Sequence, residues 1–148
     1  MTATARVAAR VLVVDPDGSV LLFRGFDPAR PDDGTWWLTP GGGVDGQETL
    51  EEAARRELYE ETGLAVEAVG PRLFERRIEF DFEGVHFDQT ETYFCVRCPQ
   101  FPVTRAGWMD HERRSMFEHR WWTLAELAVT DETVYPENLV ERLTEILA

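Results

Sequence analysis

One stretch of the sequence, Pro40–Leu64, constrains the fold and the chemistry of this chain more than any other. It opens with three consecutive glycines and continues into a segment rich in carboxylates. Within it, Thr49 and Glu52 have the spacing of a helix capping box, and Gly63 is the residue type that most readily ends a helix in the left-handed conformation. These signals predict a helix at Leu50–Glu61.

The predicted helix has one inward-facing side. At about 100° per residue its apolar side chains fall in a single arc, and these are Leu50, Ala53, Ala54 and Leu58. Glu57 and Glu61 lie in the same arc, with Glu60 at its edge. Two carboxylates one turn apart repel each other, and burying either is costly unless a positive charge lies between them. A hard divalent cation with oxygen ligands removes that cost, so the spacing indicates a metal site.

A structural network of ion pairs is the alternative explanation for so many charges on one helix. Such a network accounts for the outward-facing pairs Glu51–Arg55 and Glu52–Arg56, which have i to i+4 spacing. It does not account for the two inward carboxylates, so the metal site is the favoured interpretation.

The glycines Gly41, Gly42 and Gly43 directly precede the link into the helix. Without side chains, the backbone can approach a ligand closely there, and one of its carbonyls can serve as a further oxygen ligand. Neither the Lys-Ser/Thr pair of a P-loop nor a GxGxxG pattern accompanies them. The alternative, a plain strand-to-helix turn, would need only one of the three glycines.

The spacing of these residues is similar to the Nudix box, Gly-x5-Glu-x7-Arg-Glu-(apolar)-x-Glu-Glu-x-Gly-(apolar). Gly42 is followed after five residues by Glu48, and after seven more by Arg56–Leu64, so every fixed position is filled. The match is highly specific, although it covers only this part of the chain. The pattern of the flanking segments also fits a single domain of this family.

The resemblance implies an α+β fold, a Nudix-like α/β/α sandwich with a central mixed β-sheet. It also implies Mg²⁺-dependent hydrolysis of a nucleoside diphosphate linked to another group, with Mn²⁺ as a substitute. The positions that match the family's metal ligands are Gly41, Glu57, Glu60 and Glu61. The positions that match its brace between loop and helix are Gly42, Glu48 and Arg56. Glu60 and Glu61 are also the catalytic candidates within the box.

Further candidates lie outside the box. Arg24 is the predicted contact for a phosphate, with a solvated arginine as the alternative. Trp37 is the candidate contact for a nucleobase, although core packing is the favoured interpretation for one of Trp36 and Trp37. The long irregular segment Pro99–Met116 resembles the late loop from which Nudix enzymes often supply another acid. We expect Glu112 to be this catalytic acid, with Glu118 as second choice.

The remaining elements are predicted from periodicity and turn residues. Val7–Val14, a strand covered on both faces and interrupted only by Arg10, forms a hairpin with Val20–Phe23 around a proline and glycine turn. Arg72–Phe82 and Val85–Cys98 form a second hairpin. The later elements are a strand at His119–Trp122, a small helix opening at Thr123 and a last helix with Pro136 in its first turn.

Cys95 and Cys98 form a single CxxC. A zinc site needs four ligands, and side chains three positions apart in a strand face opposite sides. We therefore expect buried, reduced cysteines rather than a metal or redox site.

Length and charge limit the remaining possibilities. With 148 residues, positions 1–148 are expected to form one Nudix hydrolase domain. The 15 Lys and Arg against 28 Asp and Glu give a net charge of -13, which argues against nucleic acid or an anionic membrane as partner. No apolar run reaches the ~18 residues of a membrane span and no signal-peptide core is present, so a cytoplasmic location is expected. The expected partner is a small-molecule nucleotide, and family analogy suggests a homodimer.

Two other functions compete with hydrolysis. Isopentenyl diphosphate isomerases use a related fold with a catalytic cysteine, but neither cysteine here lies in a matching context. A non-catalytic nucleotide-sensing module would be expected to lose box carboxylates, and this chain retains all of them. Among hydrolase substrates, sugar nucleotides, dinucleoside polyphosphates and modified nucleoside triphosphates stay open.

Overall fold

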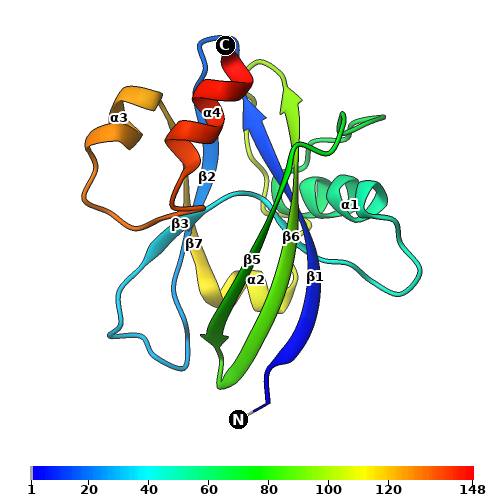
Figure 1. Cartoon of the computed structure of the whole chain (residues 1–148), viewed down its shortest axis with the longest axis vertical. Helices are drawn as coiled ribbons and strands as arrows, with labels where there is room; N and C mark the ends of the chain where they lie inside the picture. Colours follow the sequence, from blue (N-terminus) through cyan, green and yellow to red (C-terminus); the bar gives the residue numbers. More distant parts are fainter. Residues whose placement is uncertain (1) are drawn as a thin grey trace.

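A computed structural model describes residues 2–148 as one mixed β-sheet with helices on both faces (Figure 1). The strand order is β5-β6-β1-β2-β3-β8, with β4 paired to β1 and β7 paired to β2. The strands are β1 (Thr4–Val14), β2 (Val20–Gly25), β3 (Trp36–Leu38), β4 (Gly41–Gly43), β5 (Phe74–Phe82), β6 (Val85–Arg97), β7 (Met116–Trp122) and β8 (Val134–Tyr135). The helices are α1 (Leu50–Thr62), α2 (Asp110–Ser115), α3 (Leu124–Val129) and α4 (Leu139–Leu147).

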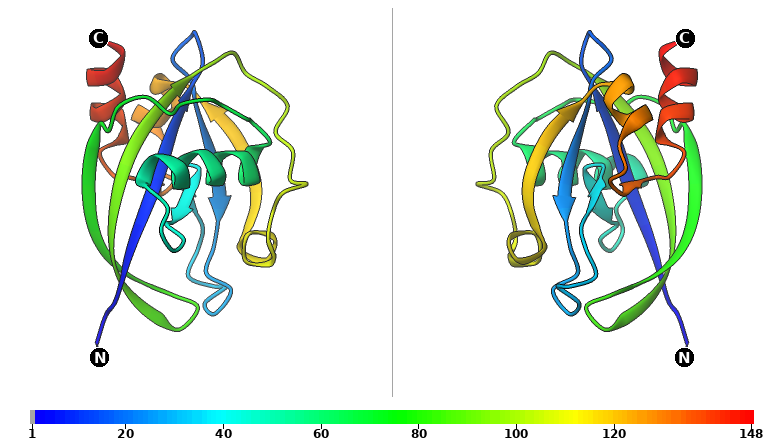
Figure 2. Two further views of the ribbon diagram at one scale, coloured as in Figure 1. Left: turned by 90° about the vertical axis from the view of Figure 1, so that its right-hand side faces the viewer. Right: turned by 90° about the vertical axis from the view of Figure 1, so that its left-hand side faces the viewer.

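Strands β1 and β2 form the predicted hairpin only next to its turn, and beyond the turn the two strands separate. Val14 and Val20 are their paired residues, next to the turn. Farther along, β3 pairs with β2 and β4 pairs with β1, both antiparallel. The chain therefore crosses from one half of the sheet to the other between β3 and β4. This crossing delivers the glycines of β4 to the start of α1, which lies over the junction (Figure 2).

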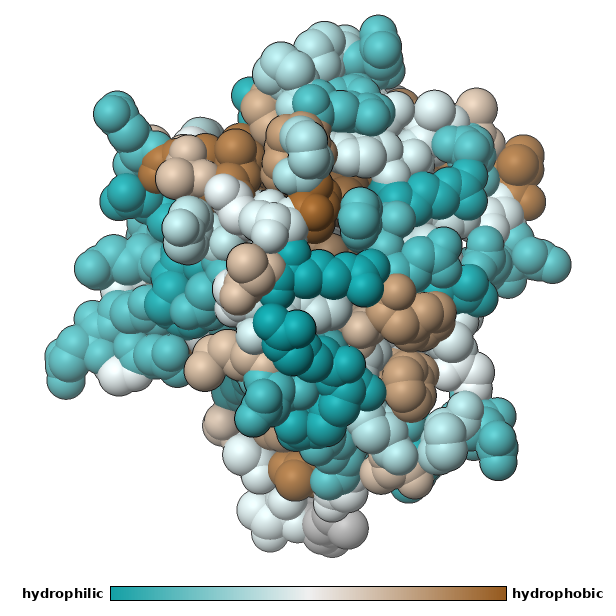
Figure 3. Space-filling view, turned by 180° about the vertical axis from the view of Figure 1, so that it is seen from behind, coloured by the Kyte–Doolittle hydropathy of each residue, from teal (hydrophilic) through white to brown (hydrophobic). Residues whose placement is uncertain are grey.

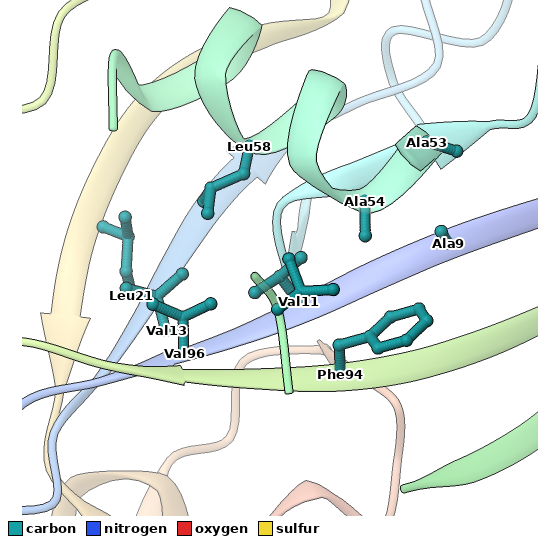
Figure 4. Packing of buried hydrophobic residues seen from close by; sticks show 10 residues of the cluster. Ala9, Val11, Val13, Leu21, Ala53, Ala54, Leu58, Phe94 and Val96 are labelled. Carbon is teal, nitrogen blue, oxygen red and sulfur yellow. The ribbon is translucent and has the colours of Figure 1, made fainter. Parts of the chain in front are cut away.

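A hydrophobic core lies on each face of the sheet because β1 is buried on both sides. Ala9, Val11 and Val13 point toward α1 and pack against its apolar side chains (Figure 4). Leu12 and Val14 point the other way, into the cluster covered by α4. The prediction of a strand covered on both faces is confirmed, as is the α/β/α sandwich with a central mixed sheet.

The predicted limits of α1 are confirmed to within one residue, since the helix ends at Thr62. At its start, the Thr49 hydroxyl accepts the Glu52 N–H at 3.1 Å and the Glu52 carboxylate accepts the Thr49 N–H at 3.0 Å. At its end, Gly63 has φ 82° and donates its N–H to the Tyr59 carbonyl at 2.8 Å. The local signals in the sequence are therefore sufficient to define this helix.

The ion pairs predicted on the outward face of α1 are wrong. Glu51 pairs with Arg72 at 3.0 Å, and Arg55 donates to the Val66 carbonyl at 3.0 Å. Arg56 turns back toward β4. Glu51 and Arg55 have their partners in the segment that follows α1. Arg56 keeps a different i to i+4 partner, Glu60 at 3.2 Å.

Three other features of the secondary structure differ from the prediction. The glycines form strand β4 instead of a turn, since the edge of β1 offers backbone partners. The segment before β7 is not irregular throughout, because it ends in the short helix α2. Pro136 precedes α4, whose N-cap is Asn138.

The surface seen from behind is predominantly hydrophilic, with apolar residues in small separate groups (Figure 3). Among residues 2–148, no helix combines the length and the apolar character that crossing a bilayer requires.

The capping box provides a direct test of what stabilises α1. Replacing Thr49 by Ala removes the acceptor for the Glu52 N–H, and we expect the free energy of unfolding to fall by about 1 kcal/mol in urea denaturation. Thr49→Ser keeps the hydroxyl and is the matched control. Equal stabilities of the Ala and Ser variants would show that the cap contributes nothing.

Candidate functional site

Three carboxylates from two helices meet beside the glycine strand. Glu57 and Glu61 lie on α1 and Glu112 on α2, and one oxygen from each lies within 4.8 Å of the others. All three residues are buried, with 6%, 3% and 4% of their surface exposed. The inward orientation predicted for Glu57 and Glu61 is found. Glu112, expected from the late segment, is the third member of the cluster.

The late segment reaches the cluster because it docks against the C-terminal end of α1 (Figure 2, left). The indole N–H of Trp108 donates to the Glu61 backbone carbonyl at 2.8 Å, and its ring packs edge-on against Phe23. A Cβ at Gly107 would lie 2.7 Å from the Glu60 carbonyl, so only glycine allows this approach. The backbone N–H of Met109 then holds one Glu112 oxygen at 2.7 Å. Sequence reasoning did not identify Trp108, whose role depends on contacts far along the chain.

Electrostatics in the cluster favour binding of a cation. Burial, together with the neighbouring Glu57 carboxylate, raises the pKa of Glu61 well above its ordinary value. Burial also raises the pKa of Glu57, although Arg56 works against it. Oε2 of Glu57 is buried without a hydrogen-bond partner among the described residues. Clustered carboxylate oxygens are the donors that a hard divalent cation prefers, so this donor set fits Mg²⁺ or Mn²⁺.

The glycine strand lies in direct contact with these carboxylates. The Gly41 N–H donates to Oε1 of Glu61 at 3.0 Å. A Cβ at Gly42 would lie 2.6 Å from Oε1 of Glu57, so a side chain there would displace the carboxylate. The carbonyl of Gly41, a predicted metal ligand, accepts a hydrogen bond from Arg10 at 3.2 Å.

Arg56 braces the link between β4 and α1. It donates to both oxygens of Glu48, at 2.7 and 2.9 Å, and to the Gly43 carbonyl at 2.9 Å. Its Nη1 lies 3.0 Å from Glu57 and 3.2 Å from Glu60. Glu60 is therefore held next to Glu57 through a shared arginine nitrogen, outside the three-carboxylate cluster. Arg56 thereby connects the Glu48 side chain and the Gly43 backbone to α1.

The two predicted substrate contacts have partners other than the carboxylates of the acidic cluster. Arg24 pairs with Glu118 at 3.2 Å and with Glu132 at 3.4 Å, and its side chain is 31% exposed. Trp37 is 2% exposed and packs against Trp122, with ring centroids 5.2 Å apart. The expectation that Trp37 stacks on a nucleobase is corrected, because its ring is enclosed in the core. Glu118, the second choice for the late acid, forms an ion pair with Arg24.

A buried network around Glu91 was not predicted. Glu91 accepts hydrogen bonds from Arg10 at 3.2 Å, Arg76 at 2.9 Å and the Tyr93 hydroxyl at 2.9 Å. Burial would raise the pKa of Glu91, but the two arginines outweigh it and hold the pKa below its ordinary value. The one available signal was Arg10, which interrupts an otherwise apolar strand and therefore needs a buried partner.

Cys95 and Cys98 are both free thiols. Cys95 packs against the core beneath α4 and Cys98 against the core beneath α1, so the two side chains diverge as predicted. Burial raises the pKa of both thiols. Neither belongs to the acidic cluster.

Comparison with known proteins identifies a matching family and several similar sequences. The model of a family described as the NUDIX domain matches residues 4–143. The oxidized purine nucleoside triphosphate hydrolase of Danio rerio is 40% identical over 96 residues, which cover 61% of this chain and 57% of the relative. An RNA pyrophosphohydrolase of Caulobacter vibrioides is 48% identical over 73 residues, covering 49% of this chain and 40% of the relative. The aligned segments thus span less than two thirds of either relative.

A solved structure shares the whole fold. The NUDIX domain of Shewanella oneidensis NrtR, determined in complex with ADP ribose, superposes with a TM-score of 0.71. The alignment covers 99% of this chain and 91% of that chain at 18% sequence identity. At this identity the likeness establishes the fold.

Proposed function

The chain belongs to the NUDIX family, and from this premise we propose that it hydrolyses a pyrophosphate bond in a nucleotide, using Mg²⁺, with Mn²⁺ as a substitute. The bond is one within a nucleoside diphosphate linked to another group. The observation that supports this proposal most strongly is the meeting of Glu57, Glu61 and Glu112 beside a strand made only of glycine. A buried cluster of this kind costs stability unless it serves a cation.

Each residue of the cluster has a proposed task. Glu57 and Glu61 are the principal metal ligands, with Glu60 and the Gly41 carbonyl as further ligands. When bound, the metal would neutralise the diphosphate and lower the pKa of a water molecule that attacks phosphorus. Gly41 orients Glu61 through its N–H, and Arg56 restrains Glu57 from the other side.

Glu112 is the proposed proton acceptor. Its carboxylate is a member of the cluster, yet it comes from a different segment than the other two. One oxygen is held by the Met109 N–H, and the other lies 2.7 Å from Nε2 of His111. The His111 side chain is 55% exposed, so a proton taken up at Glu112 has a route to solvent. Glu60 is the alternative acceptor.

The substrate is proposed as a class. The names of the relatives include an oxidized purine nucleoside triphosphate hydrolase and RNA pyrophosphohydrolases, and the structural neighbour holds ADP ribose. All three chemistries contain a pyrophosphate bond. Arg24, which is partly exposed and pairs with Glu118 and Glu132, is the proposed phosphate contact. We propose that residues 1–148 act as one domain in the cytoplasm, and that the net charge of -13 disfavours contact with the body of a nucleic acid.

A substrate panel tests this proposal. Purified protein is incubated with Mg²⁺ and, separately, ADP-ribose, diadenosine tetraphosphate, 8-oxo-dGTP and a 5′-triphosphorylated RNA, in water enriched in oxygen-18. We expect at least one of these to yield two phosphate-containing products, one of which carries the label, as attack of water on phosphorus requires.

Different failures have different meanings. An absence of product from every compound with Mg²⁺ and with Mn²⁺ would contradict the hydrolase. Tight nucleotide binding without turnover would favour a sensing module. Loss of activity in Cys95→Ala would favour the isomerase-like alternative, because the hydrolase needs no cysteine.

A further inference from the structure

Arg10 links three parts of the chain that are far apart in the sequence. Its Nη1 lies 3.2 Å from the Thr39 carbonyl and 3.2 Å from the Gly41 carbonyl, and its Nε lies 3.2 Å from Glu91. The side chain is only 15% exposed. A planar guanidinium can make these contacts at once because its donors diverge in a fixed fork.

The glycine whose carbonyl Arg10 holds is in contact with the acidic cluster through its N–H, on the preceding peptide group. The Gly41 N–H donates to Oε1 of Glu61 at 3.0 Å, while the Gly41 carbonyl accepts from Arg10. Gly41 has φ 144°, and a Cβ there would lie 2.3 Å from the Ala9 carbonyl oxygen. The backbone of Gly41 therefore lies in close contact with β1. If the Arg10 side chain is altered, the Gly41 backbone can shift, and the hydrogen bond from its N–H to Glu61 shifts with it.

We propose that Arg10 is a positioning residue for the metal-binding carboxylates, which it orients by holding the Thr39–Gly41 backbone against β1. This inference rests on the proposed function, because it concerns the same site. Among residues 2–148, Arg10 hydrogen-bonds to no carboxylate of the cluster, and its contact at the site is the Gly41 carbonyl. It acts through the backbone of β4.

An alternative role for Arg10 is to neutralise Glu91 in the core. Arg76 separates the two roles, because it pairs with Glu91 from the opposite side at 2.9 Å and is also 15% exposed. The other hydrogen bonds of Arg76 among the described residues go to Glu137, so they do not reach the glycine strand. Removal of either arginine leaves Glu91 with one cation, but only removal of Arg10 releases Gly41.

The experiment compares Arg10→Met, Arg10→Lys and Arg76→Met with the unmodified full chain. Mn²⁺ binding to each protein is measured by electron paramagnetic resonance without nucleotide, and thermal melting of each is recorded without metal. We expect Arg10→Met to weaken Mn²⁺ binding by about tenfold or more, the loss typical when a residue that orients a metal ligand is removed. Arg10→Lys keeps the charge but not the fork, so it should recover stability without recovering full affinity. Arg76→Met should lose stability and bind Mn²⁺ within about twofold of the unmodified protein.

Kinetics supply the second readout on whichever nucleotide the substrate panel identifies. Arg10→Met should lower kcat and leave the KM for the nucleotide nearly unchanged, since the contact acts on the carboxylates. Unchanged Mn²⁺ affinity in Arg10→Met and Arg10→Lys would overturn the proposal. Equal weakening in Arg76→Met would also overturn it, because the effect would then arise from Glu91. If the protein hydrolyses no nucleotide, the hydrolase fails, but the Mn²⁺ titration still decides the role of Arg10.

Discussion

Replacing Glu61 by Gln should lower turnover by about a thousandfold, which corresponds to about 4 kcal/mol in the activation barrier. Gln has the same shape, and its amide oxygen can still accept the Gly41 N–H, so the backbone around the site should not move. The change removes one of three buried negative charges from the cluster. Steady-state kinetics with saturating Mg²⁺, using the substrate that the panel identifies, measures the loss. Glu57→Gln should give a loss of similar size.

The same substitution should act in the opposite direction on stability. Glu57 and Glu61 are buried and repel each other, so a neutral amide relieves a cost that the fold carries for the sake of the site. In the presence of a chelator, Glu61→Gln should therefore melt at a higher temperature than the unmodified protein. Addition of Mg²⁺ should raise the melting temperature of the unmodified protein and have little effect on the variant.

The control is Glu51→Gln, which changes a carboxylate of the same helix that faces solvent and pairs with Arg72. It should leave turnover and Mg²⁺-dependent stabilisation unchanged. If Glu61→Gln retained more than about a tenth of the original kcat, the acidic cluster would not be the catalytic centre.

The features that were predictable from the sequence are local ones. The limits of α1 follow from a capping box and a glycine within the same stretch, and helical periodicity alone turns Glu57 and Glu61 inward. Glu112 could be proposed because the long irregular segment that contains it resembles the late loop from which Nudix enzymes often supply another acid. Its position beside Glu57 and Glu61, however, depends on the docking of Trp108 on the end of α1.

Contacts between distant segments were not predictable. Arg10 and Glu91 are separated by 81 positions, and no spacing rule connects them. The burial of Trp37 follows from its packing against Trp122, on a strand near the other end of the sequence. A strand at the glycines was not predicted, because β4 exists only where the separation of β1 from β2 leaves a free strand edge. In each case the missing information is which elements become neighbours in the sheet.

Replacing Gly42 by Ala should strongly lower turnover while leaving the fold intact. The three atoms nearest to a Cβ at this position all belong to the Glu57 carboxyl group, the closest at 2.6 Å. A methyl group would therefore push Glu57 out of the cluster, because the first atoms that it meets belong to this side chain and not to backbone. We expect kcat to fall by about a hundredfold, or about 2.7 kcal/mol, with a weaker affinity for Mn²⁺ and a melting temperature close to that of the unmodified protein.

Gly41→Ala provides the contrast, because its Cβ would meet backbone. It would lie 2.3 Å from the Ala9 carbonyl oxygen and 2.7 Å from the Arg10 Cα, at a φ of 144° that side chains rarely adopt. The expected result is a loss of about 3 kcal/mol or more in the free energy of unfolding, measured by urea denaturation. Two neighbouring glycines thus have different reasons to lack a side chain, one to leave room for a carboxylate and the other to let β4 lie against β1. If Gly42→Ala lost as much stability as Gly41→Ala and bound Mn²⁺ normally, both glycines would serve only the packing of β4.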